Sequence, residues 1–288
     1  MTMFASPEDA RTRLSAVDYL TDPAIATAVF LADALGKPLL IEGPAGVGKT
    51  ELAKAVAAAT SAELIRLQCY EGLDESRALY EWDYRKQLLR IQAGVDGWDE
   101  ARAGIFAEEF LLARPLLTAI RRDEPTVLLI DETDKADVEV EGLLLEVLSD
   151  FQVTIPELGT ITASRRPFVV LTSNATRELS EALKRRCLYL YIDYPTPERE
   201  RDIVLTRVPG IRAQLAEQVV RTVASLRALE LKKAPSIAET LDWARTLIAL
   251  EADTLDEEAI ARTLGVVLKH AADHTRAAKE LGLPGIGG

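Results

Sequence analysis

A glycine-rich stretch near the N-terminus has the residue types and spacing that most clearly predict chemistry. The residues run Gly43-Pro44-Ala45-Gly46-Val47-Gly48-Lys49-Thr50 and fit the pattern G-x-x-x-x-G-K-[ST]. In this pattern the backbone N–H groups of the loop bind phosphate oxygens, the lysine reaches the terminal phosphates and the hydroxyl holds Mg²⁺. We therefore expect a nucleoside triphosphate site, with Gly43 to Gly48 as the phosphate cradle, Lys49 as the phosphate clamp and Thr50 on the metal.

The residues on either side of the loop supply the context that this motif needs. Leu39 to Ile41 form a short apolar run typical of a strand, and Glu51 to Ala59 are typical of a helix. The start of a helix also presents its positive dipole end to a bound anion. The alternative is an ordinary strand-turn-helix corner.

Two adjacent carboxylates follow a second apolar run. Thr126 to Ile130 predict a buried strand, and Asp131 and Glu132 come directly after it. Beside a phosphate loop, we expect Asp131 to complete the Mg²⁺ shell and Glu132 to polarise an attacking water. The alternative is a solvent-facing strand end or a helix cap.

Polar residues follow two further segments. Phe168 to Ser173 predict another buried strand, and the amide of Asn174 at its end is expected to contact the γ-phosphate or the attacking water, with a loop cap as the alternative. A helix predicted from Glu178 ends in Lys184-Arg185-Arg186. Basic residues in a last turn are favoured by the helix dipole, but an arginine could also be delivered to a neighbouring copy's γ-phosphate. The sequence leaves both interpretations open.

The remaining segments predict the elements that carry these groups. We expect two helices before the phosphate loop, a strand over 63–69, helices over 78–92 and 108–122, and a β-hairpin over 151–163. From residue 195 onward only helices are expected, over 197–208, 211–229, 236–250 and 256–270, with capping boxes at Ser236/Glu239 and Thr254/Glu257. The fold class is therefore α/β, a P-loop NTPase with a parallel sheet flanked by helices and a C-terminal all-helical lid. The expected divisions are an N-terminal helix (1–21), a nucleotide-binding domain (22–194) and the lid (195–288).

Composition excludes several functional classes. The 288 residues include 34 basic and 46 acidic ones, a formal charge of −12 that argues against broad nucleic-acid or anionic-lipid binding. No apolar run is long enough for a membrane span, and the N-terminus lacks a signal-peptide pattern, so we expect a cytoplasmic protein. The two cysteines, Cys69 and Cys187, have no metal-ligand or redox spacing.

The order of these motifs resembles an AAA+ ATPase, and more narrowly the MoxR family, over about residues 20 to 270. The hairpin at about 151–163 is similar to the pre-sensor hairpin of that family, and residues 78–108 lie where its helix-2 insert would be. The resemblance implies ATP and Mg²⁺ as cofactors and a homo-oligomeric ring, expected to be a hexamer. It also implies that Glu132, Asn174 and, in trans, Arg186 with Arg185 beside it are catalytic.

Several short stretches resemble the CoxD branch of the MoxR family, which is associated with maturation of carbon monoxide dehydrogenase. They include Gln68 to Asp74, Leu79 to Tyr84 and Arg185 to Tyr189. By that resemblance the ATPase would act as a chaperone-like remodeller of a protein client such as a molybdenum hydroxylase, beside a von Willebrand factor A-type partner. One position departs from the family, because Ile237 stands where the sensor-2 arginine is expected, with Lys232 or Lys233 as its substitute.

The sequence is also compatible with three alternative functions. An AAA+ motor acting on DNA is disfavoured by the acidic balance. A small-molecule kinase with a phosphate loop would need an acceptor pocket and no arginine from a neighbour. A nucleotide-bound adaptor with little turnover is disfavoured by the presence of Glu132 and Asn174.

Overall fold

The computed structural model describes residues 2–92 and 104–281, and the chain divides into two compact units. Unit 1 comprises Met1–Glu42 and Lys49–Tyr191, and unit 2 comprises Gly43–Gly48 and Ile192–Gly288. The glycine-rich loop is therefore grouped with the C-terminal helices, and the rest of the α/β region forms the other unit.

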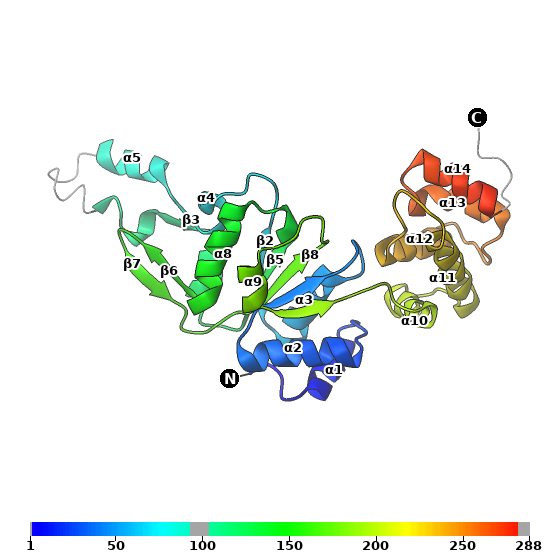
Figure 1. The fold of residues 1–288 in the computed structure, drawn as a ribbon, viewed down its shortest axis with the longest axis horizontal. Helices are drawn as coiled ribbons and strands as arrows, with labels where there is room; N and C mark the ends of the chain where they lie inside the picture. The colour runs from blue at the N-terminus through cyan, green and yellow to red at the C-terminus, as the bar shows by residue number, and fades with distance from the viewer. Residues whose placement is uncertain (1, 93–103, 282–288) are drawn as a thin grey trace. The chain divides into compact units, whose positions relative to one another are not determined.

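The centre of unit 1 is a five-stranded parallel sheet (Figure 1). Its strands, in spatial order, are β2 (Glu63–Gln68), β5 (Thr126–Asp131), β8 (Phe168–Ser173), β1 (Leu39–Glu42) and β9 (Leu188–Tyr191). Every residue of β5 and β8 is buried, as expected for central strands of a sheet covered on both faces. The order places β8 between β1 and β5, so that the carboxyl ends of these three strands are neighbours. The predicted fold class is confirmed.

Helices surround the sheet, and their caps agree with the sequence. They are α1 (Pro7–Ser15), α2 (Pro23–Leu35), α3 (Lys49–Thr60), α7 (Pro115–Arg121), α8 (Val138–Asp150) and α9 (Glu181–Arg186). Ser6 and Asp22 cap α1 and α2, and a proline follows each cap. The two helices predicted before the phosphate loop are confirmed.

The helix predicted over residues 78–92 is wrong in its first half. The structure has a short helix α4 (Glu75–Ala78), a strand β3 (Tyr80–Trp82) and only then a helix α5 (Tyr84–Gln92). Trp82 is buried and packs edge-on against the rings of Tyr80 and Phe106. Packing of the aromatic side chains has therefore overridden the helical period. The rest of the predicted insert, residues 93–103, lies outside the described residues.

The continuous helix predicted over residues 108–122 is also wrong. A 3₁₀ turn η1 (Glu108–Phe110) leads into β4 (Leu111–Ala113), which pairs antiparallel with β3, and α7 begins only at Pro115. Proline has no N–H to donate and is therefore placed at the start of a helix, not within it. The sequence signal for this boundary was present at Pro115.

The predicted hairpin is confirmed as β6 (Gln152–Ile155) and β7 (Gly159–Thr162), which pair antiparallel. Gly159 has a φ of 81°, which a residue with a side chain rarely adopts. The inward residues of β6, Val153 and Ile155, are buried in the same hydrophobic cluster as Trp82 and Phe110. The hairpin itself packs against α7 and α8.

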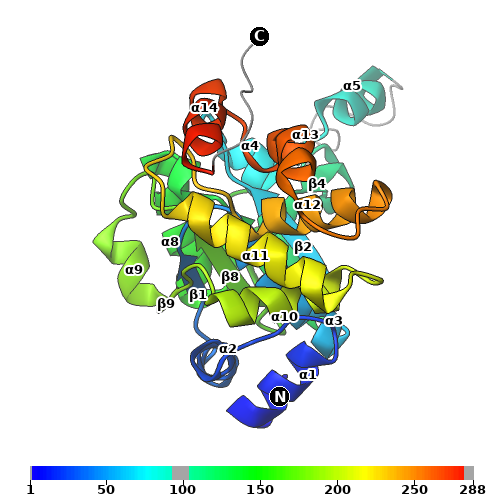
Figure 2. The same ribbon diagram turned by 90° about the vertical axis from the view of Figure 1, so that its right-hand side faces the viewer.

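The C-terminal part of unit 2 is entirely helical in the described residues, as predicted. Its helices are α10 (Pro197–Arg207), α11 (Ala213–Arg227), α12 (Ile237–Ala249), α13 (Glu257–Val267) and α14 (Ala271–Glu280). Figure 2 shows α10, α11 and α12 side by side. Trp243 of α12 is fully buried in a core that it shares with residues of α11, α13 and α14, and its Nε1 donates a hydrogen bond of 2.7 Å to Thr263.

Only one of the two predicted capping boxes is present. Ser236 and Glu239 form the reciprocal box at the start of α12. At α13 the cap is Asp256, whose carboxylate accepts from the N–H of Ala259 at 2.8 Å, so the predicted box at Thr254 is wrong. The predicted last helix also ends at Val267, and α14 is a separate helix.

Within residues 2–92 and 104–281, every helix is too short or too polar to cross a membrane.

Candidate active site

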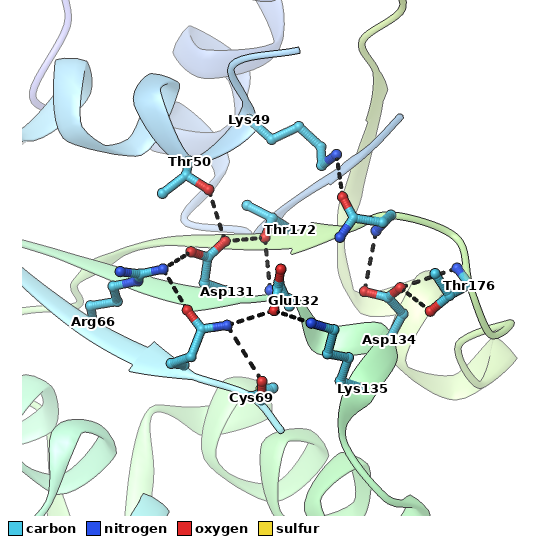
Figure 3. A network of polar contacts seen from close by, with 12 residues as sticks. Lys49, Thr50, Arg66, Cys69, Asp131, Glu132, Asp134, Lys135, Thr172 and Thr176 are labelled. Atoms are coloured by element: carbon cyan, nitrogen blue, oxygen red, sulfur yellow. Dashed lines mark hydrogen bonds and ion pairs between the residues drawn. The ribbon is translucent and has the colours of Figure 1, made fainter. Parts of the chain in front are cut away.

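Four of the predicted side chains meet at the carboxyl edge of the sheet in unit 1 (Figure 3). Lys49 and Thr50 are the first residues of α3, Asp131 is the last residue of β5, and Asn174 directly follows β8. The Nζ of Lys49 donates to Oδ1 of Asn174 at 2.8 Å, and the hydroxyl of Thr50 donates to Oδ1 of Asp131 at 2.9 Å. Residues from three distant segments therefore form one polar cluster.

Asp131 is buried, with several donors around its carboxylate. Its Oδ1 accepts from Thr50 and from the hydroxyl of Thr172 at 2.5 Å, and its Oδ2 forms an ion pair with Arg66. A hydroxyl and a carboxylate oxygen, 2.9 Å apart, are the hard oxygen ligands that Mg²⁺ prefers when a nucleotide supplies the rest of its shell. Thr50 and Asp131 therefore fit a magnesium ion bound with phosphates.

Glu132 adjoins Asp131 in the chain but has a different environment. Its φ of 56° is uncommon for a residue other than glycine, and its N–H donates to the hydroxyl of Thr172 at 2.9 Å. Its Oε2 accepts from Nε2 of Gln68 at 2.9 Å and from Nζ of Lys135 at 2.6 Å, and its side chain is 33% exposed. The two neighbouring carboxylates thus differ in access to solvent, which allows them different chemical roles.

Lys49 is a buried cation among acids. Its side chain is nearly inaccessible, and burial lowers the pKa of its ammonium, although the negative charges of Asp134, Asp131 and Glu132 oppose that change. Burial, with the same three carboxylates, raises the pKa of the Cys69 thiol to about 12. Cys69 is therefore a neutral thiol at physiological pH and not a nucleophile.

Asp134 is a member of the cluster that the sequence reasoning missed. Its Oδ1 accepts from the N–H of Asn174 at 3.2 Å, and its Oδ2 accepts from the N–H and hydroxyl of Thr176. Burial raises the pKa of this carboxyl, but the hydrogen bonds from Thr176 and Asn174 outweigh that effect and lower the pKa below its ordinary value. Asp134 therefore holds the turn that carries Asn174. The signal was a third acidic residue just after Asp131 and Glu132.

Four other polar residues of the cluster also went unpredicted. They are Arg66, Gln68, Lys135 and Thr172. Gln68 could have been found, because it ends a strand, as Asp131 does; Arg66 and Thr172 lie within strands and carry no signal in a single sequence.

The glycine-rich loop connects β1 directly to Lys49. Gly43, Gly46 and Gly48 have φ values of 152°, 77° and 100°, which glycine adopts at little cost. A Cβ on Gly43 would lie 1.9 Å from the carbonyl oxygen of Ile192, so no larger residue fits there without a backbone shift. The other predicted cradle residues, Pro44, Ala45 and Val47, lie between these glycines.

The two predicted arginines lie elsewhere in unit 1, in the last turn of α9. Both are exposed. Arg186 donates from Nε to the hydroxyl of Ser149 on α8 at 2.6 Å and from Nη1 to the carbonyl of Ala182 at 3.3 Å. Within the part of the chain that the structure describes, neither arginine has a hydrogen bond or ion pair to the cluster around Lys49 and Asn174.

The model of the AAA domain (dynein-related subfamily) matches residues 38–187. The chain belongs to this family. The matched range contains Lys49, the Asp131–Glu132 pair, Asn174 and both arginines of α9. The AAA-family chain therefore carries an AAA+ ATPase domain.

Curated relatives of this AAA-family chain include chaperones. It is 36% identical over 138 residues to the chaperone protein ClpB 2 of Parasynechococcus marenigrum, a match covering 47% of this chain and 13% of that protein. It is 27% identical over 237 residues to the chaperone protein ClpB of Staphylococcus aureus, covering 75% of this chain and 25% of that protein. The chain thus spans about a quarter or less of the length of these relatives.

Solved structures of similar fold include two mutants of RuvB from Thermotoga maritima. One has a TM-score of 0.52 at 17% identity and covers 98% of this chain and 84% of that chain. The other has a TM-score of 0.51 at 18% identity and covers 96% and 82%. These similarities show the AAA+ P-loop fold alone.

Proposed function

We propose that this AAA-family chain binds ATP with Mg²⁺ and hydrolyses it at the carboxyl edge of the sheet. The observation that carries the proposal is the convergence of Lys49, Thr50, Asp131, Glu132 and Asn174 in one connected group at three strand ends. A buried lysine of a G-x-x-x-x-G-K-T motif that lies beside two adjacent carboxylates and an amide is the arrangement that binds and hydrolyses a nucleoside triphosphate.

Binding of the triphosphate falls to the loop and the start of α3. The N–H groups of Gly43, Ala45, Gly46, Val47 and Gly48 form the cradle, and Pro44, which has no N–H, lies within the same loop. When the nucleotide binds, the ammonium of Lys49 leaves Asn174 and donates its hydrogen bonds to the terminal phosphates. Thr50 and Asp131 hold Mg²⁺, which when bound neutralises phosphate charge and orients the terminal phosphate.

Hydrolysis falls to Glu132 and Asn174. The partly exposed carboxylate of Glu132 orients a water molecule toward the γ-phosphorus, so that the new P–O bond forms in line with the bond to ADP that breaks. The amide of Asn174, freed from Lys49, donates to a γ-phosphate oxygen. Asp134 keeps Asn174 in place through its backbone N–H.

We further propose that the chain works as a homo-oligomeric ring, a hexamer, in which Arg186 of one copy acts on the γ-phosphate bound to the next, with Arg185 beside it. Both arginines are exposed, and among residues 2–92 and 104–281 neither is linked to the cluster of its own chain, which supports this arrangement. A guanidinium that arrives from a neighbour supplies positive charge to the transition state.

The work done by the ring is proposed to be chaperone-like remodelling of a protein client. The similarity to chaperones named ClpB supports this class of activity, and the formal charge of −12 disfavours DNA as the substrate. The resemblance to the CoxD branch of the MoxR family favours a molybdenum hydroxylase such as carbon monoxide dehydrogenase as the client, with a von Willebrand factor A-type protein as a partner.

The residues that stand in place of a sensor-2 arginine indicate how far the lid takes part in hydrolysis. Ile237 is buried at the start of α12, and Lys233 pairs with Glu239 at 3.6 Å. Lys232 is exposed, and its N–H donates to Asp273 at 2.8 Å. We propose that hydrolysis in this chain depends less on an arginine from the lid than on Arg186.

The experiment that tests the proposal is Glu132→Gln, measured for both ATP binding and ATP hydrolysis. The amide keeps the size of the side chain but cannot orient water as the carboxylate does, so we expect hydrolysis to fall about 100-fold or more while ATP still binds. Glu139→Gln, an exposed glutamate on α8, is the matched control and should retain the wild-type rate. Full hydrolysis by Glu132→Gln, or absence of hydrolysis by the wild type, would contradict the proposal.

A further inference from the structure

Arg66 lies outside the motifs described above, and its guanidinium forms an ion pair with Asp131, the first of the two adjacent carboxylates. Arg66 is in β2, and its Nη2 donates both to Oδ2 of Asp131 and to Oε1 of Gln68. The side chain of Arg66 is 49% exposed, whereas that of Asp131 is 4% exposed. An arginine thus binds the outer oxygen of the carboxylate whose inner oxygen faces Thr50 (Figure 3).

The same arginine reaches the second carboxylate through Gln68. Because Arg66 donates to the amide oxygen of Gln68, the amide nitrogen of Gln68 is turned toward Oε2 of Glu132, at 2.9 Å. Residues 66 and 68 are two apart on a strand and so lie on one face of the sheet. Asp131 and Glu132, adjacent in sequence and both bonded to Thr172, are therefore also connected through Arg66 and Gln68.

The charge of Arg66 has a direct consequence at the carboxylate. A guanidinium on Oδ2 of Asp131 reduces the negative potential at Oδ1, the oxygen beside Thr50. A cation bound between Thr50 and Asp131 would meet that reduced potential. Solvent screens the effect of the Arg66 charge on this potential, because Arg66 is half exposed.

We propose that Arg66 is a positioning residue with two effects: it orients Glu132 through Gln68, and it weakens the hold of the Thr50–Asp131 site on Mg²⁺. A weaker hold favours release of the metal with ADP after each turnover. The inference rests on the proposed function and adds a regulator of the same site.

The test compares Arg66→Ala with Gln68→Ala by two measurements. The first is calorimetric binding of ADP at increasing Mg²⁺ concentrations, which needs no turnover. The second is kcat for ATP hydrolysis. We expect Arg66→Ala to lower the Mg²⁺ concentration for half-maximal binding about threefold and to lower kcat about tenfold. Gln68→Ala should lower kcat to a similar extent and leave the Mg²⁺ dependence unchanged.

Two further variants keep the test decisive. Arg66→Lys retains the positive charge and should return the Mg²⁺ dependence toward the wild-type value, even if Arg66→Ala folds poorly. Arg122→Ala removes an arginine that pairs with Glu63, at the opposite end of β2, and should change neither measurement.

The outcomes separate this inference from the function on which it rests. A wild-type chain that hydrolyses ATP, with an Arg66→Ala variant of unchanged or raised half-maximal Mg²⁺ concentration, would overturn the role of Arg66 alone. A wild-type chain that binds Mg²⁺ and ADP without hydrolysing ATP would overturn the proposed function, while the shift in Mg²⁺ dependence would still support the role of Arg66.

Discussion

The polar cluster at the sheet edge and the basic end of α9 are opposite in character. In the cluster, Lys49 and Asp131 are buried and every member has a partner within the chain. At the end of α9, Arg185 and Arg186 are exposed, and within the described residues Arg185 has no side-chain partner. The Arg186 side chain donates hydrogen bonds to the hydroxyl of Ser149 and to the backbone carbonyl of Ala182.

The difference indicates two kinds of functional residue. A group that binds a ligand within its own chain is oriented in advance by buried hydrogen bonds, which limits the motion lost on binding. A group that acts on another copy must stay accessible to that copy, so its side chain can form few hydrogen bonds within its own chain. The following variants test this distinction, beginning with the largest expected effect.

Arg186→Ala should lower kcat about 100-fold or more if the arginine acts on a neighbour's nucleotide. In a mixed ring each variant copy withholds its arginine from one neighbouring site, while its own site can still receive an arginine from a wild-type copy. The rate falls more steeply than dilution predicts when the copies of the ring hydrolyse ATP in a coordinated order. The measurement is the ATPase rate of wild-type chains mixed with increasing fractions of the variant, alongside the mass in solution with and without ATP.

Arg11→Ala, which changes an exposed arginine on α1, is the control and should leave the ATPase rate of the mixture unchanged. Arg185→Ala, compared in the same way, tests the second arginine of the pair. A silent Arg186→Ala, with full hydrolysis by a monomer, would leave the end of α9 without the trans role and favour a kinase or switch.

Asp134→Asn should have a smaller effect, about tenfold on kcat, because it loosens the turn that positions Asn174 without removing a reacting group. The same variant should change stability in acid. The pKa of Asp134 is lowered on folding, so its contribution is present above the ordinary value of 3.8 and is lost as pH falls through the lowered pKa.

The free energy of unfolding of the wild type should therefore decrease more steeply below about pH 4 than that of Asp134→Asn, which denaturant unfolding at several pH values would measure. Equal slopes for the two proteins would mean that Asp134 is not held as an anion by its hydrogen bonds. An unchanged kcat would mean that the turn holds Asn174 without it.

Lys135→Ala should have the smallest effect. Its ammonium lies 2.6 Å from Glu132, but the two side chains are 48% and 33% exposed, and ion pairs of that exposure contribute little. We expect a change of less than about twofold in kcat, measured beside Gln68→Ala. An effect of Lys135→Ala as large as that of Gln68→Ala would show that charge, and not the hydrogen bond from Gln68, positions Glu132.

Short apolar strands were predicted well because the signal is local. β5 and β8 each form an unbroken apolar run that ends in polar residues, and no other element type fits so short a buried run with such an end. The region from residue 78 to 122 was predicted poorly because its helical period was competing with ring packing around Trp82. That packing brings together residues more than twenty positions apart, which a local pattern cannot show.

By itself the sequence determined which groups could do chemistry: a phosphate loop ending in Lys49 and Thr50, an acidic pair after a buried strand and an amide after another. Only the tertiary structure decided that they meet. The order β2-β5-β8-β1-β9 inserts β8 between the loop strand and the acid strand, so Asn174 reaches Lys49 across 125 positions of sequence. Strand order depends on the packing of helices over the whole sheet, and so do the contacts of Arg66, Gln68 and Asp134, which no local pattern encodes.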